Sequence, residues 1–83
     1  MDVDRIVAVL YIHNTNREID VDIPLDITAY ELMISLNQGF HLNLNTENIS
    51  QCVLKTENPI ALLKGDKLLR EYGLHDGTII NIV

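Results

Sequence analysis

The residues with the greatest chemical potential in this sequence are three histidines and one cysteine. His13, His41 and His75 lie in three separate polar segments, and no two of them stand at the spacing of a metal-binding pair. Cys52 has no sequence neighbour that would clearly activate a thiolate, so we expect a packed, unreactive thiol. The sequence therefore predicts no catalytic residue, no metal site and no cofactor.

The composition excludes further classes of protein. The formal net charge of −6 argues against nucleic acid and anionic lipid as partners, because both select clusters of Lys and Arg. A single cysteine cannot form an internal disulfide and indicates a reducing compartment. The N-terminus lacks the pattern of a signal peptide, and the longest apolar run, residues 6–12, is too short to cross a bilayer as a helix. We therefore expect a cytoplasmic protein that does not insert into membranes.

The apolar pattern predicts a strand hairpin at the start of the chain. Residues 6–12 are apolar throughout and rich in β-branched side chains, which is typical of a strand covered on both faces. Residues 13–17 are turn formers. Residues 18–23 alternate strictly between acidic and apolar side chains, as a half-exposed edge strand does. Further strands are expected at 49–57, 60–63 and 78–83, and a turn or 3₁₀ segment at 68–74.

One helix is predicted at residues 28–38. Thr28 is a good N-cap and Glu31 completes a capping box with it. Apolar residues at helical spacing form one face, and Gly39 is expected just beyond the C-terminal end. The element order predicts a single α+β domain, residues 1–83, in which the helix packs on a mixed four- to five-stranded sheet whose first and last strands lie side by side.

The order and spacing of these elements resemble the β-grasp fold of the ubiquitin superfamily. Residues 69–74, Leu-Arg-Glu-Tyr-Gly-Leu, are similar to ubiquitin's Leu-Ser-Asp-Tyr-Asn-Ile before the last strand. By this resemblance Tyr72 packs against the sheet with its hydroxyl bonded to backbone. Conjugation by ubiquitin uses a C-terminal Gly-Gly, whereas this sequence ends Asn-Ile-Val, so we expect no conjugation.

A more specific resemblance is to the YukD/EsaB family of type VII secretion systems in Gram-positive bacteria. It is carried by the length, the acidic charge and the Tyr-Gly-Leu-x-Asp-Gly stretch at residues 72–77. The resemblance implies a non-enzymatic accessory or regulatory component that binds proteins of the machinery, such as a membrane ATPase or pseudokinase. The alternative is a ubiquitin-like scaffold or regulator of an enzyme or transcription factor unrelated to secretion. An FtsK-type ATPase and WxG-type substrates encoded nearby would distinguish the two.

The first strand predicts an interaction surface, because only alternate residues of a strand can face the helix. The hairpin loop leaves the register open, and we favour Val7, Val9 and Tyr11 inside the core. The opposite row would then be exposed and form a surface for a partner protein or a second copy of the chain. Its residues are Ile6, Ala8, Leu10, Ile12, Ile79 and Val83. The acidic row of strand two, residues 18, 20 and 22, either docks a basic partner or protects the sheet edge.

Overall fold

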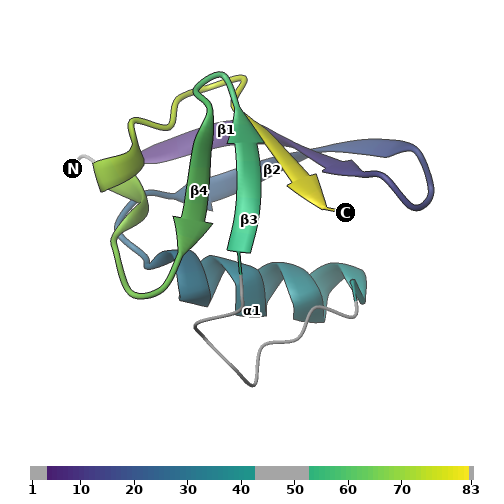
Figure 1. Ribbon diagram of the computed structural model, residues 1–83, viewed down its shortest axis with the longest axis horizontal. Coiled ribbons are helices and arrows are strands. Elements are labelled where there is room, and N and C mark those ends of the chain that lie inside the picture. The colour runs from purple at the N-terminus through teal and green to yellow at the C-terminus, as the bar shows by residue number, and fades with distance from the viewer. Residues whose placement is uncertain (1–3, 43–52, 83) are drawn as a thin grey trace.

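The structure, a computed structural model, describes residues 4–42 and 53–82. This part of the chain forms a mixed sheet with one α-helix across one of its faces (Figure 1). The elements, in chain order, are β1 (Arg5–Ile12), β2 (Arg17–Pro24), α1 (Ala29–Phe40), β3 (Val53–Glu57), β4 (Ala61–Lys64), the 3₁₀ helix η2 (Leu69–Tyr72) and β5 (Ile79–Ile82). The predicted α+β architecture is confirmed. The expected strand residues 49–52, which include Cys52, lie outside the described residues, as does Val83.

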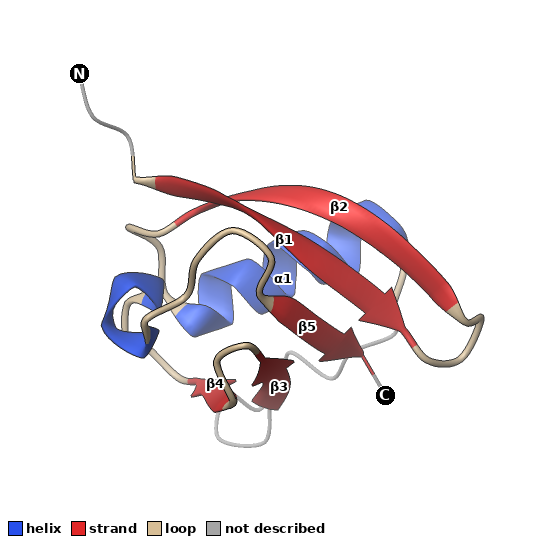
Figure 2. Ribbon diagram, turned by 90° about the horizontal axis from the view of Figure 1, so that it is seen from above, coloured by secondary structure: helices blue, strands red, loops and turns tan. Residues whose placement is uncertain are grey.

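The five strands are ordered β2-β1-β5-β3-β4. β1 and β5 run parallel, and the other neighbouring strands are antiparallel. The prediction that the first and last strands lie side by side inside the sheet is confirmed, and β2 forms an edge (Figure 2). This order explains why β1 is apolar along most of its length. A strand with a neighbouring strand on each side and a helix on one face exposes few of its atoms to water.

The predicted side-chain register of β1 is wrong by one residue. Ile6, Ala8, Leu10 and Ile12 lie in the core, and the row of Val7, Val9 and Tyr11 faces away from the helix. Cross-strand partners share a face of the sheet, and Ile6, Ala8 and Leu10 lie opposite the apolar Ile23, Val21 and Ile19 of β2.

The length of the hairpin turn is the physical reason for this difference. The turn occupies residues 13–16, and Ile12 therefore lies opposite Arg17. The expected turn of residues 13–17 would have placed Ile12 opposite Glu18. The odd-numbered residues of β1 would then have faced the apolar row of β2. One residue in the turn thus exchanges the two faces of the strand.

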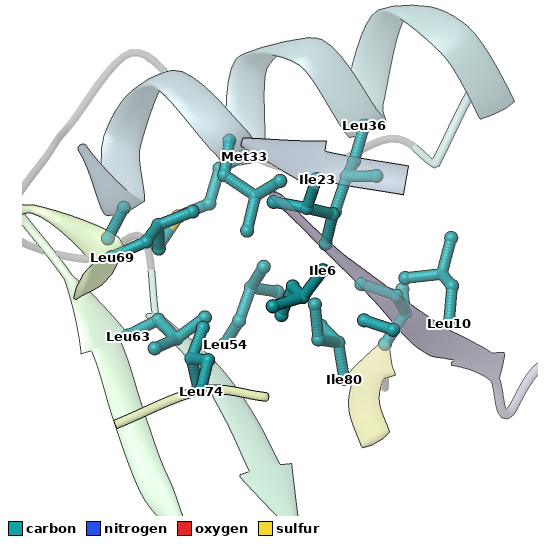
Figure 3. Packing of buried hydrophobic residues seen from close by; sticks show 14 of the residues in the cluster. Ile6, Leu10, Ile23, Met33, Leu36, Leu54, Leu63, Leu69, Leu74 and Ile80 are labelled. Carbon is teal, nitrogen blue, oxygen red and sulfur yellow. The ribbon is translucent and has the colours of Figure 1, made fainter. Parts of the chain in front are cut away.

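The core lies between the sheet and α1 and is almost entirely aliphatic (Figure 3). Leu10, Leu63, Leu69 and Ile80 are fully enclosed. Ile80 and Ile82 of β5 face inward and are buried. β5 contributes these residues directly beside Leu10 and Ile12 of the parallel strand β1, which makes the β1–β5 pair the centre of the packed layer.

The predicted start of the helix is confirmed and its predicted end is wrong. The hydroxyl of Thr28 accepts a hydrogen bond from the Glu31 amide at 3.0 Å, and the Glu31 carboxylate accepts one from the Thr28 amide at 2.9 Å. The helix continues through Gly39 to Phe40, whose side chain packs against the core. The left-handed residue that ends it is His41, with φ of 54°. The packing of Phe40 against the core therefore outweighs the tendency of Gly39 to end the helix.

The predicted 3₁₀ segment is confirmed as η2, and so is the environment of Tyr72. The Tyr72 ring is half-buried against the core, and its hydroxyl donates to the Lys64 carbonyl at 3.1 Å. The Lys64 amide in turn donates to the same hydroxyl at 3.3 Å. Tyr72 thereby fastens η2 to β4 and is a structural residue.

The capping box leads to a first prediction. Thr28→Ala removes the acceptor for the Glu31 amide and should lower the free energy of unfolding by about 1 kcal/mol. For a domain of this size that corresponds to a fall in Tm of roughly 4–8 °C, which calorimetry can measure. Thr28→Ser keeps the acceptor and should melt close to the parent protein. An unchanged Tm in the alanine variant would contradict the capping role.

The register of β1 leads to a second prediction. Leu10→Ala leaves a cavity in the core and should lower the free energy of unfolding by about 2–5 kcal/mol. Val7→Thr keeps a β-branched side chain on the other face of the sheet. This change should alter the free energy of unfolding by no more than about 0.5 kcal/mol. Denaturant titration of both variants measures the difference. Equal effects, or a larger effect at Val7, would mean that β1 is paired in the other register.

Candidate functional site

The candidate functional site is the outer face of the sheet, which we define as the face turned away from α1. Strand pairing assigns residues to it, because Cα partners in neighbouring strands point to the same side. The outer face comprises Glu18, Asp20 and Asp22 of β2, Val7, Val9 and Tyr11 of β1, Ile79 and Asn81 of β5, Val53, Lys55 and Glu57 of β3, and Leu62 and Lys64 of β4.

The structure separates the predicted interaction residues. Ile6, Ala8, Leu10 and Ile12 are buried under the helix and cannot contact a partner in the folded protein. Ile79 does lie on the outer face, half-buried beside Val9. The apolar row beside Ile79 belongs to Val7, Val9 and Tyr11, the residues that the sequence analysis predicts to lie in the core. An aliphatic surface at this position is therefore present, with Val7 and Val9 in place of the residues predicted from the sequence.

The apolar strip of Val7, Val9 and Ile79 runs along the centre of the outer face. Val7 is 49% exposed. The strip is bordered on one side by the acidic row of β2, in which Asp22 lies opposite Val7 and Asp20 opposite Val9. In the described part of the chain, Asp22 alone of this row forms an ion pair, with the Arg5 guanidinium at 2.9 Å. The border of the strip is therefore negative, with Glu18 and Asp20 as its members that form no ion pair among the described residues.

A second apolar group lies across the face, at β3 and β4. Ile60, in the turn between these strands, is 89% exposed, and Leu62 is 52% exposed. The two line a shallow hollow of about 480 Å³ together with five other residues. Those residues are Lys55, Thr56, Glu57 and Asn81, together with Ala61. The hollow combines aliphatic side chains with hydrogen-bonding groups, a combination that is common in protein–protein interfaces.

A polar network that sequence analysis missed separates the two apolar groups. Asn81 donates from Nδ2 to the Glu57 carboxylate at 3.0 Å. Since a carboxylate can only accept, this contact turns Oδ1 of Asn81 toward His13, whose Nε2 lies 2.9 Å away and must donate. The His13 ring stacks on Tyr11 with centroids 4.3 Å apart. An asparagine within the apolar strand β5 was the only sequence signal of this network.

Two further properties of the described residues concern metal ions and membranes. Nowhere in residues 4–42 and 53–82 do three or more His, Cys, Asp or Glu residues gather in a way that could hold a metal ion. In the same ranges, no helix has the length and apolar character needed to cross a membrane. What the outer face can do is contact another surface through aliphatic, acidic and amide groups.

Solved structures with this fold are ubiquitin-like. The C-terminal ubiquitin-like domain of mouse tubulin-specific chaperone e matches with a TM-score of 0.75 and 14% identity, covering 99% of this chain and 88% of that one. The UBL domain of Plasmodium falciparum Dsk2 matches with a TM-score of 0.64 and 18% identity, covering 95% and 99%. A designed protein based on ubiquitin matches with a TM-score of 0.65 and 21% identity, covering 93% and 84%. At these identities the likeness concerns the fold alone.

The sequence itself matches one protein family along nearly its full length. No protein with curated annotation matches the chain in sequence. The match to the family covers residues 6–82, from the first core residue of β1 to the end of β5. The family is described as protein YukD of the WXG100 protein secretion system. This chain, a ubiquitin-like β-grasp protein by its fold, therefore belongs to the YukD family.

Proposed function

We propose that this chain is a non-enzymatic accessory or regulatory component of a WXG100, or type VII, secretion system, and that it acts by binding another protein of that system through the outer face of its sheet. The observation that carries the proposal is an exposed aliphatic surface, in which Val7, Ile60 and Leu62 are each about half exposed or more. The chain that bears this surface belongs to a family that is tied to secretion. Exposed aliphatic side chains that gather on one face of a small protein commonly mark an interaction site.

The composition of the outer face supports a protein as the occupant. Aliphatic side chains lie near its centre, and charged side chains border them, with Glu18 and Asp20 along one edge and Lys64 along the other. Aliphatic contacts combined with polar and charged groups are the usual composition of a protein–protein interface. In this proposal the chain works in the cytoplasm as one ubiquitin-like domain, and its partner is the membrane ATPase or pseudokinase of the machinery.

The proposal assigns the chain no reaction of its own, and in particular no conjugation to other proteins. Its support is the dispersion of the described ionisable groups, which form no metal-binding cluster. The role is thus one of recognition.

Export in the native host tests the function and the surface separately. Deletion of the gene should reduce export of the WXG100 substrates, measured in the culture medium, and the parent sequence should restore it. Val7→Lys and Leu62→Lys place a charge at exposed apolar positions of the outer face and should fail to restore export, since substitution of a key interface residue commonly weakens binding by more than about 1 kcal/mol. Each variant's fold is checked by circular dichroism.

The matched control is Gln38→Lys, which adds the same charge on an exposed position of α1 away from the outer face and should restore export. If the deletion leaves export unchanged, the proposed function is wrong. If the deletion stops export but both outer-face variants restore it, the function stands and the binding surface lies elsewhere.

The absence of conjugation is checked in vitro. The purified protein, incubated with ATP and an extract of the native host, should give no product of higher mass on a denaturing gel or by mass spectrometry. Ubiquitin with its activating enzymes serves as the positive control. A ladder of covalent adducts would contradict a purely non-covalent role.

A further inference from the structure

The free edge of β2 presents unpaired backbone groups. In β1, the odd-numbered residues bond toward β5: the Val9 amide donates to the Thr78 carbonyl at 2.8 Å, and the Val7 carbonyl accepts from the Gly77 amide at 3.0 Å. The even-numbered residues of β1 must therefore bond toward β2, where they lie opposite its odd-numbered residues. The amides and carbonyls of the even-numbered residues Glu18, Asp20 and Asp22 consequently point out of the sheet.

These outward groups have no protein partner within the described ranges. β2 pairs with β1 and with no other strand, and it stands first in the strand order (Figure 2). The strand is 8 residues long, which is enough to pair along its length with another extended segment. A long uncovered edge of this kind is a template for strand addition unless its side chains prevent that.

An apolar groove runs beside this edge on the helix side. It has a volume of about 410 Å³ and lies between β2 and α1. Its walls are mainly aliphatic and aromatic, with Ser35 and Asp22 as the polar members. The apolar lining residues are Val21, Ile23, Pro24, Ile27, Leu32, Leu36 and Phe40. A strand added to β2 would place every second side chain into this groove.

The other side of the same edge is acidic. Glu18, Asp20 and Asp22 are exposed on the outer face of β2 and alternate with the residues that face the groove. Of the three, Glu18 and Asp20 form no ion pair in the part of the chain that the structure describes. The side chains of an added strand that face outward would lie directly beside these carboxylates, where opposite charge stabilises the pairing and like charge opposes it.

We propose that the free edge of β2 binds an extended segment of a partner protein in which apolar and basic side chains alternate. The segment adds to the sheet as a further strand, its backbone bonding to the outward groups of Glu18, Asp20 and Asp22. Its apolar residues enter the groove against α1, and its Lys or Arg residues lie beside the acidic row. This site is distinct from the apolar strip on the outer face.

The charges exclude a second copy of the chain from this edge. Two β2 strands paired edge to edge would bring two acidic rows alongside each other, and each row would lie opposite like charges. The acidic row thus combines two roles: it prevents self-association through β2 and selects a basic strand. The net charge of −6 adds a long-range attraction for such a segment.

Synthetic peptides test this proposal without any secretion component. The probe is a peptide of alternating Lys and Val with the 8-residue length of β2, titrated into the isotope-labelled chain and followed by NMR. Binding should shift the amides of β2 and of the groove, slow hydrogen exchange at Glu18, Asp20 and Asp22, and weaken as salt is added. A Glu/Val peptide of the same pattern should not bind, and neither should a Lys/Val peptide N-methylated at the bonding positions.

A pair of variants locates the charge contribution. Asp20→Lys should weaken binding of the Lys/Val peptide roughly three- to tenfold, because it replaces an attraction by a repulsion. Asp66→Lys makes the same change of charge at an exposed position outside β2 and should bind within about twofold of the parent protein.

Three results would overturn the proposal. They are equal binding of the Glu/Val peptide, shifts confined to β3, β4 and β5, and no binding of the Lys/Val peptide at about 1 mM. None of them bears on export by the outer-face variants, so failure here and failure of the proposed function can be told apart.

Discussion

The pairing of β1 with β2 is the constraint on which the rest of the structure depends. The turn of residues 13–16 sets it. Asn16 adopts a left-handed conformation with φ of 57°, its amide donates to the His13 carbonyl at 3.3 Å, and its side chain accepts from the Tyr11 hydroxyl at 2.6 Å. These contacts close the turn so that Ile12 lies opposite Arg17. Every later choice of face follows from this single alignment, because side chains alternate along both strands.

The alignment explains how an almost wholly apolar strand serves a small protein. The inner row of β1 packs with β5 and α1 and supplies the centre of the core, while the outer row leaves Val7 and Val9 beside Ile79 on the open face. The same alternation in β2 directs the acidic residues outward and the aliphatic residues toward the helix. Core, apolar strip and acidic edge are therefore three consequences of one hairpin.

The fold by itself carries no function, since ubiquitin-like domains serve many unrelated proteins. What distinguishes this chain is the chemistry distributed over its surface. The outer face offers an aliphatic strip and a hollow beside the Asn81–Glu57 contact, and the β2 edge offers unpaired backbone between an apolar groove and an acidic row. The two surfaces adjoin along β2.

The sequence by itself determined the features that depend on near neighbours in the chain. Strand positions, the Thr28–Glu31 cap and η2 all follow from residues within a few positions of one another. Tertiary structure alone decided the face of β1, the end of α1 at His41 and the contact between His13 and Asn81, which are 68 residues apart. The physical reason is that local patterns specify period and propensity, whereas a face or a long-range contact depends on which segments pair and at what offset, and a difference of one residue in a turn reverses it.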